Sequence, residues 1–326
     1  MTVIYRIPKW FGRLGNNLIQ ISNCLWSAYT THGAFEMPEH DNIAQISERF
    51  CMPGQINPEV VSEATAAQTF HGPPLSGRTP KFFEFVRDAA RSTLYQALEF
   101  PLKNQDPLPE NTLVVHVRST DIVRYRQSSK VNKTYMCNPI TFFDDAAKQF
   151  DHVIVLSQSD QHPLLTYFQE RDWEIRTGGT IEEDAALILR AQNLCIGSTS
   201  SFSAMLGLCS QHLKRIYLSS LSHQQWKCPI DSFFYHVSIE KHFYLYPMQW
   251  IETQKNTHGA AFLRMLVEFP VRKMSKLRFN RRQLVDASIP RLIEWQKFHK
   301  RTDKPDPPFP VSLDVEKPPE GESDAV

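Results

Sequence analysis

An apolar run that ends in charged residues constrains this chain more than any other feature. The run Leu113–Val117 is apolar apart from His116, and it stops at the polar segment Arg118–Asp121. Short β-branched runs bounded by turn residues are typical of strands that are buried on both faces of a parallel sheet. Ligands of such sheets bind outside the carboxyl ends of the strands. We therefore expect a pocket beside Arg118.

The residues at this strand end suit the binding of an anion. The planar guanidinium of Arg118 donates in a fixed fork, which matches phosphate or carboxylate oxygens. The alternative is a structural ion pair between Arg118 and Asp121. His116 is more often a structural hydrogen-bonding group than a catalyst at such a position, and Asp121 is the candidate general base.

The same sequence of apolar strand, polar tip and helix recurs along the chain. Strands are expected at Val3–Ile7, Leu113–Val117, His152–Leu156, Trp173–Arg176, Leu194–Ile196 and Ile216–Leu218. Helices are expected over Leu18–Tyr29, Lys81–Phe100, Asn138–Phe150, Pro163–Arg171 and Ile181–Ala191, and from the serines at 200–203 onwards. Strands that alternate with helix-length segments predict βαβ units, a parallel sheet and the α/β class. Residues 33–80 show no pattern that can be placed.

The chain is long enough for two domains. Of its 326 residues, 1–109 are expected to form an N-terminal α/β domain, and the prolines before residue 110 mark the boundary. Residues 110–240 are expected to form a second α/β domain, and residues 241–302 are expected to be a basic segment that returns to the first domain. The tail 303–326 is rich in proline and acid, a composition typical of disorder.

Composition narrows the class of protein. The formal net charge of +1 gives no global bias towards nucleic acid, and the six cysteines contain no Cys-x-x-Cys pair. This favours a reducing compartment and argues against a zinc site. Without a signal segment or an apolar span, a cytoplasmic protein is expected. The basic runs Arg124–Lys133 and Arg272–Arg282 leave open a non-enzymatic polyanion binder or a peripheral membrane contact.

Two loop-to-helix turns supply further groups that bind anions. The first turn carries Gly12, Gly15, Asn16 and Asn17 before a helix, and the second is the serine-rich stretch 198–203. Free backbone amides at a helix start bind phosphate, although serine N-caps are also common without any ligand.

These motifs, taken in order, resemble a known family. The motifs are Gly12–Asn17, His116–Asp121, Ser157–Asp160, Glu183–Asp184 and Ser200–Ser203. Their order is similar to that in the α1,2-fucosyltransferases and the related α1,6- and protein O-fucosyltransferases. The resemblance implies a GT-B-like architecture in which two Rossmann-like domains face a cleft. The domain of residues 110–240 would bind the nucleotide sugar, and the domain of residues 1–109 would help to receive the acceptor. It also implies inverting transfer of fucose from GDP-fucose to a glycan hydroxyl, with α1,2 linkage and without a metal.

The resemblance assigns roles to individual residues. Arg118 would hold the donor phosphates together with Ser200, Ser201 and Ser203 of the serine helix. Either Asp160 or Asp184 would contact the nucleotide base. Gly15, Asn16 and Asn17 would face the sugar across the cleft. No cofactor is implied beyond the donor substrate, and the partners are this donor and a glycan acceptor.

Three departures from the family pattern leave the donor open. Ser119 replaces a second arginine, Asn17 replaces a glutamine, and Ala204-Met205 replaces a pair of tryptophans. A transferase that uses another nucleotide sugar therefore remains an alternative. A sulfotransferase would need a phosphate loop with a basic residue after the first strand, where this chain offers only Arg13. The chain has no Asp-x-Asp element, which agrees with chemistry that needs no metal.

Overall fold

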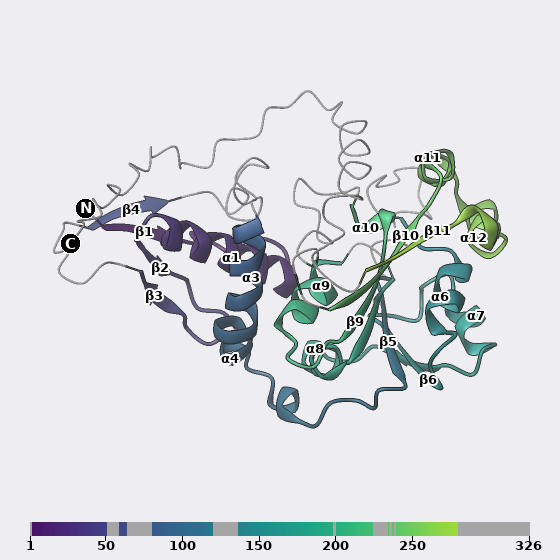
Figure 1. Ribbon diagram of the computed structural model, residues 1–326, viewed down its shortest axis with the longest axis horizontal. Helices are drawn as coiled ribbons and strands as arrows, with labels where there is room; N and C mark the ends of the chain where they lie inside the picture. Colours follow the sequence, from purple (N-terminus) through teal and green to yellow (C-terminus); the bar gives the residue numbers. More distant parts are fainter. Residues whose placement is uncertain are drawn as a thin grey trace, which may run out of the picture.

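The chain folds into two α/β units, each built on its own sheet (Figure 1). The computed structural model describes residues 2–50, 59–63, 80–119, 136–197, 200–223, 234, 237 and 239–279. The strand order is β3-β2-β1-β4 in the first sheet and β11-β10-β9-β8-β5-β6-β7 in the second. The predicted α/β class is thus confirmed.

The first unit is a small, mostly parallel sheet with helices beside it. Its strands are β1 (Thr2–Arg6), β2 (Ala34–Glu36), β3 (Ser47–Arg49) and β4 (Glu59–Glu63). Strand β1 pairs in parallel with β2 and β4, whereas β3 is antiparallel to β2. The helices are α1 (Leu14–Thr30), α3 (Pro80–Ala89) and α4 (Tyr95–Ala97), with a π-helical turn η2 (Ala90–Leu94) and a 3-10 turn η3 (Pro101–Asn104).

The second sheet is parallel except for its last strand. Its strands are β5 (Thr112–Val117), β6 (His152–Ser157), β7 (Glu174–Thr177), β8 (Asn193–Ile196), β9 (Arg215–Ser219), β10 (Glu240–Leu245) and β11 (Ser275–Phe279). Strand β11 runs antiparallel to β10. Strand β5 lies between β6 and β8. The apolar run that most constrains the sequence therefore forms β5, an interior strand of this sheet.

Helices cover both faces of this sheet. They are α6 (Ile140–Ala147), α7 (Leu165–Gln169), α8 (Ile181–Arg190), α9 (Ser201–Cys209), α10 (Ser220–His223), α11 (Met248–Asn256), α12 (Gly259–Val267) and a 3-10 turn η5 (Val271–Lys273). In Figure 1, α8 and α9 lie on the side that faces the first unit, and α6 and α7 lie on the opposite side.

Alternate side chains of β5 enter two different cores. Leu113, Val115 and Val117 pack in the core that contains α6, α7 and α12, whereas Val114 packs in the core that contains α8 and α9. All four side chains are fully buried. This burial on both faces explains why the run is almost wholly apolar instead of alternating.

Helix α9 joins the two units. Its residues from Ser203 to Cys209 are buried, and its apolar side chains share one core with those of α1 and α3. At its carboxyl end, the guanidinium of Arg87 donates to the carbonyl of Leu208. Arg91 donates to the carbonyls of Ser210 and Gln211 at 3.2 and 3.1 Å. Cations at a helix carboxyl end satisfy its unpaired carbonyl groups and oppose its dipole.

Several expected boundaries need correction. The unplaced stretch 33–80 contains β2, β3 and β4, which are too short to show a period in the sequence. The helix expected over Lys81–Phe100 changes to a π-helical turn at Ala90 and ends at Ala97, because Leu98 is extended.

The carboxyl-terminal part of the chain also differs from the expected division. Residues 241–279 do not return to the first unit, because β10 and β11 pair onto the edge of the second sheet. The rest of the expected basic segment, from 280 to 302, and the tail 303–326 lie outside the described residues. Among the helices that the structure describes, none combines the length and apolarity needed to cross a membrane.

Candidate functional site

The carboxyl ends of four neighbouring strands bring most of the candidate residues to one edge. The four strands are, in sheet order, β8, β5, β6 and β7. The residues that follow their carboxyl ends include Ser200, Arg118, Gln158 and Gly178, respectively. Neighbouring strands lie about 4.8 Å apart, so the four strand ends span roughly 14 Å. Groups that are far apart in the sequence are thereby arranged side by side along one line.

The serine residues begin α9 at this edge. The hydroxyl of Ser200 is the N-cap and accepts from the backbone N–H of Ser203 at 3.4 Å. Ser203 is fully buried, and its hydroxyl has no hydrogen-bond partner among the described residues. A buried polar group without a partner is costly, and such groups in native proteins usually have a functional or solvent partner. Ser203 is therefore the strongest candidate ligand of this helix.

The amino end of α1 meets the amino end of α9 (Figure 1). Ser201 donates its hydroxyl proton to the side-chain oxygen of Asn16 at 2.5 Å. A Cβ atom at Gly15 would lie 2.3 Å from the backbone nitrogen of Phe202. Only glycine permits this approach, and neither helix carries an acidic residue in its first turn. Two positive helix ends therefore meet with no acidic residue in either first turn to neutralise them.

The loop before α1 adds a cation to the same edge. Gly12 takes a positive φ of 77°, which is the left-handed region that favours glycine. The next residue, Arg13, donates from Nη1 to the side-chain oxygen of Gln158 at 2.9 Å. The loop of the first unit thus contacts the end of β6 in the second. Arg13 was not assigned to the site from the sequence, although its place between two loop glycines marks it.

The two asparagines of this loop are used differently. Asn16 reaches α9, as described above. Asn17 is buried and its amide nitrogen donates to the carbonyl of Phe11 at 3.3 Å, while its oxygen lies 3.1 Å from Nε2 of His40. The polar atoms of Asn17 therefore hold the loop and the segment after β2 together within the first unit.

The end of β5 is tied to the end of β6. Ser119 is fully buried, and its hydroxyl accepts from the backbone N–H of Ser159 at 3.0 Å. The hydroxyl of Ser159 lies 3.1 Å from it as well. At the position where the family pattern has a second arginine, this chain therefore has a small residue that joins two strand ends. Neither this bridge nor the contact of Gln158 was anticipated from the sequence.

Two buried histidines lie beneath this edge. Burial, reinforced by the charge of Arg118, lowers the pKa of His116 to about 4. Burial and the neighbouring His116 lower the pKa of His162 to about 3. Both imidazoles are therefore neutral at pH 7, and His116 is a poor proton acceptor at that pH. The Nδ1 atom of His116 has no hydrogen-bond partner among the residues that are described.

The remaining predicted residues fall into three groups. Asp160 lies in the turn after β6 and is exposed. Asp184 lies in the first turn of α8. Asp121 and the basic loop Arg124–Lys133 lie outside the described residues. Within the part of the chain that is described, no three His, Cys, Asp or Glu side chains gather as metal ligands.

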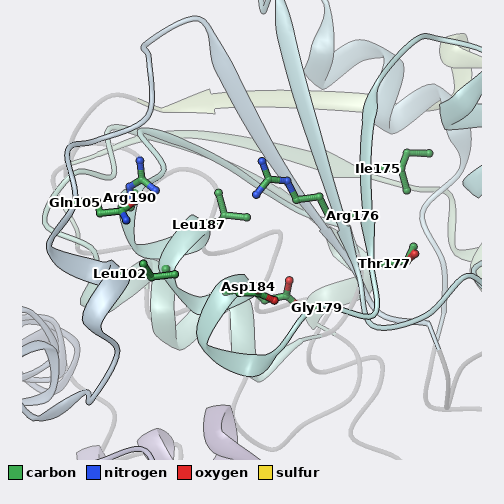
Figure 2. A pocket seen from close by; sticks show the side chains of 11 residues that line it. Leu102, Gln105, Ile175, Arg176, Thr177, Gly179, Asp184, Leu187 and Arg190 are labelled. Carbon is green, nitrogen blue, oxygen red and sulfur yellow. The ribbon is translucent and has the colours of Figure 1, made fainter.

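A cavity of about 540 Å³ lies along α8 at the edge strand β7 (Figure 2). Its lining comes from η3 and the following linker, β7 and α8, and includes Leu102, Gln105, Arg176, Gly179, Asp184, Leu187 and Arg190. Figure 2 shows the guanidinium groups of Arg176 and Arg190 on either side of Leu187, with Asp184 beside Gly179. Arg176 was not singled out in the sequence, because a single arginine in a short strand carries no signal.

The carboxyl group of Asp184 has an unusual environment. Burial raises its pKa to about 6, the neighbouring Glu183 contributes, and Arg176 acts in the opposite direction. The raised value means that the fold favours the protonated carboxyl group. The contribution to stability is therefore complete below about pH 4 and is lost as the pH rises through about 6. A carboxylate that is costly to ionise and faces a cavity is a candidate ligand-binding group.

Replacing Asp184 with asparagine should remove this pH dependence. The asparagine variant should be about as stable as wild type at pH 4 and more stable at pH 7.5. We expect a difference of about 1–2 kcal/mol, because solvent screens part of the penalty at a partly exposed site. Urea unfolding of both proteins at each pH measures it. A variant that is less stable than wild type at pH 7.5 would show that the ionised carboxylate is stabilising, contrary to this account.

Comparison with known proteins gives no match by sequence. No family model matches the chain, and no curated protein does. Two crystal structures of POFUT1 in complex with GDP are similar to it in structure. The first shares 11% identity with a TM-score of 0.35, covering 65% of this chain and 96% of that one. The second shares 12% identity with a TM-score of 0.34, and the match covers 66% of this chain and 97% of that one.

Proposed function

We propose that this protein is an inverting glycosyltransferase that moves fucose from GDP-fucose to a glycan hydroxyl, in α1,2 linkage and without a metal. The observation that supports this best is the meeting of the amino ends of α1 and α9, where the ring of Phe202 lies 5.5 Å from that of His116, two residues before Arg118. The order of the sequence motifs supports the same donor. A non-enzymatic polyanion binder would not need such a convergence at a strand edge.

The diphosphate would lie against these two helix ends. Backbone N–H groups at helix starts bind phosphate oxygens, and the buried hydroxyl of Ser203 adds a donor. Arg118 would grip the outer oxygens with its fork. When the sugar leaves, negative charge develops on the diphosphate, and donors fixed in the fold stabilise this charge without reorganising.

The nucleotide base would lie further along the strand ends, in the cavity over α8. Guanine presents two neighbouring N–H donors, which an ionised carboxylate accepts as a pair. Asp184 is the better candidate for this contact because it lines the cavity, whereas Asp160 is exposed at the turn after β6. With a pKa of about 6, Asp184 is ionised at neutral pH.

The chemical step is a displacement at the anomeric carbon. The oxygen of the acceptor hydroxyl forms the new C–O bond, the bond from carbon to the β-phosphate oxygen breaks, and its electron pair stays on GDP. The hydroxyl proton passes to a base, for which we propose Asp121. Neutral His116 would support Arg118 through packing instead of acting as the base, because its pKa of about 4 is too low.

A donor screen tests the proposed function. The protein is incubated in EDTA with GDP-fucose, GDP-mannose and several UDP-sugars, and nucleotide release is measured with and without glycans. We expect release from GDP-fucose alone, and we expect GDP to raise Tm. Nucleotide release from a different sugar nucleotide would identify that compound as the donor instead of GDP-fucose. The serine at position 119, where the family pattern has arginine, leaves this outcome open. Stabilisation by every polyanion, with a steep loss in salt, would instead favour a polyanion binder.

Replacing Ser203 with alanine should weaken GDP binding without loss of stability. The Ser203 hydroxyl has no partner among the described residues, so its removal breaks no hydrogen bond that the fold shows. A hydrogen bond to a charged group contributes about 1.5–3 kcal/mol, which corresponds to roughly a 10–100-fold loss of affinity. Calorimetry with GDP measures it, and Ser92→Ala on an exposed helix turn is the control. Unchanged affinity would exclude Ser203 as a phosphate ligand.

A further inference from the structure

A second cavity opens in the first unit, and none of the groups assigned to the donor lines it. It measures about 550 Å³ and lies at the carboxyl ends of β1 and β2. Its lining consists of Arg6, Ile7, Pro8, Glu36, Met37, Pro38, Gln45 and Ser47. Pockets that bind small molecules are typically about 300–1,000 Å³ in volume. The cavity therefore has the size of a ligand site, and the proposed donor does not use it.

The lining of this cavity is polar but electrically balanced. Arg6 and Glu36 form an ion pair at 2.7 Å, and their side chains remain 43% and 35% exposed. The amide of Gln45 and the hydroxyl of Ser47 add neutral polar groups, while Pro8 and Pro38 add apolar surface. The guanidinium of Arg6 and the carboxylate of Glu36 together donate and accept hydrogen bonds, which suits the vicinal hydroxyls of a sugar. A charged ligand would meet an ion of its own sign within the pair.

Two loops connect this cavity to the donor side. One runs from Pro8 to α1 and the other from Pro38 to His40. They are joined because the indole nitrogen of Trp10 donates to the carbonyl of Glu39 at 2.8 Å. The rings of Trp10 and His40 lie 4.9 Å apart, edge to face.

The aromatic pair continues directly to α1. His40 lies 3.1 Å from the side-chain oxygen of Asn17, and the preceding residue, Asn16, reaches Ser201 at the amino end of α9. The partly exposed ring of Trp10 is thus tied to Glu39, next to the lining residue Pro38, and through His40 to α1. An aromatic ring of this kind offers apolar area beside polar groups, as a sugar face requires.

We propose that this cavity binds neutral sugar residues of the acceptor glycan, behind the residue that receives the transferred sugar. The proposal rests on the proposed function and narrows its acceptor to an uncharged oligosaccharide. The carboxyl edge of the first sheet faces the second unit (Figure 1), so an acceptor held there extends towards the donor. A peptide acceptor is the competing outcome of the test.

The test fills the cavity without disturbing the core. Ser47 is exposed on β3, so Ser47→Trp places a large ring in the cavity and removes no buried contact. Arg49→Trp places the same ring two residues further along the strand, outside the lining, and serves as the control. Binding of galactose-, mannose- and N-acetylglucosamine-terminated neutral oligosaccharides, a sialylated oligosaccharide and an uncharged peptide is followed by saturation-transfer NMR without any nucleotide.

We expect wild type and Arg49→Trp to bind at least one neutral oligosaccharide, and Ser47→Trp to bind it at least 10-fold more weakly. GDP affinity should be the same in all three proteins. Binding of the peptide alone, preference for the sialylated sugar, or equal sugar binding by Ser47→Trp would overturn the proposal. The NMR measurement needs no donor, so it tests the acceptor site independently of GDP binding. Loss of sugar binding with normal GDP binding would contradict the acceptor site alone, and loss of GDP binding with normal sugar binding would contradict the donor site alone.

Discussion

Replacing Arg118 with alanine should lower the rate of transfer by roughly 10²–10³-fold, the usual cost of losing a fixed donor to a developing negative charge. Arg118 follows β5 directly, and its charge acts on the buried imidazole of His116. The contact with the diphosphate strengthens as the sugar departs, so turnover should fall more than GDP affinity does. Single-turnover transfer and calorimetry with GDP measure the two quantities.

Replacing Arg118 with lysine separates charge from shape. Lysine keeps the charge but cannot reproduce the fork, so we expect an intermediate rate with GDP affinity closer to wild type. Arg171→Lys is the control, because Arg171 pairs with Asp144 on the opposite face of the sheet. Wild-type rate and affinity in Arg118→Ala would refute the proposed donor site.

Replacing Gly15 with alanine should disrupt the junction between the two units. The added Cβ would lie 2.3 Å from the backbone nitrogen of Phe202 and 2.4 Å from the carbonyl carbon of Ser201. Both are backbone atoms of α9, so the helices must separate. Overpacking of this kind costs about 1–3 kcal/mol, and the cost should lie at the upper end here because no side chain can rotate away. Thermal unfolding should show a Tm lower by roughly 4–5 °C.

Gly179→Ala is the matched control for this change. Its Cβ would meet only the flexible carboxylates of Asp184, at 3.1 Å, and of Glu183, at 3.5 Å. We expect a much smaller effect on Tm. GDP affinity should also fall in Gly15→Ala, because the shift moves the amino ends of α1 and α9 apart. A variant with unchanged Tm would show that α1 and α9 approach less closely than this structure describes.

The strand and helix starts of the second unit follow from local sequence. The run Leu113–Val117 forms β5 because every side chain in it is buried, and an apolar run is what such a strand requires. The start of α8 was equally readable. Thr180 and Glu183 form a reciprocal capping box, with Thr180 accepting from the backbone N–H of Glu183 at 3.2 Å.

The first unit shows where local sequence is insufficient. Strands β2 and β3 have three residues each, which is too few for a period to appear. Strands β10 and β11 join the second sheet although their segment reads as basic and irregular. Strand pairing between distant segments depends on which edge the rest of the fold leaves open.

The sequence by itself determined the α/β class, the position of Arg118 at a strand end and the serine start of α9, because hydrophobic period and capping act within a few residues. Only the tertiary structure decided which of these groups meet. Ser201 and Asn16 are 185 positions apart and Arg13 and Gln158 are 145 apart, yet both pairs form hydrogen bonds. The first contact forms because α1 packs on α9, which the absence of a side chain at Gly15 permits. The second forms because the first loop packs on the end of β6. No local pattern in the sequence encodes how two helices pack.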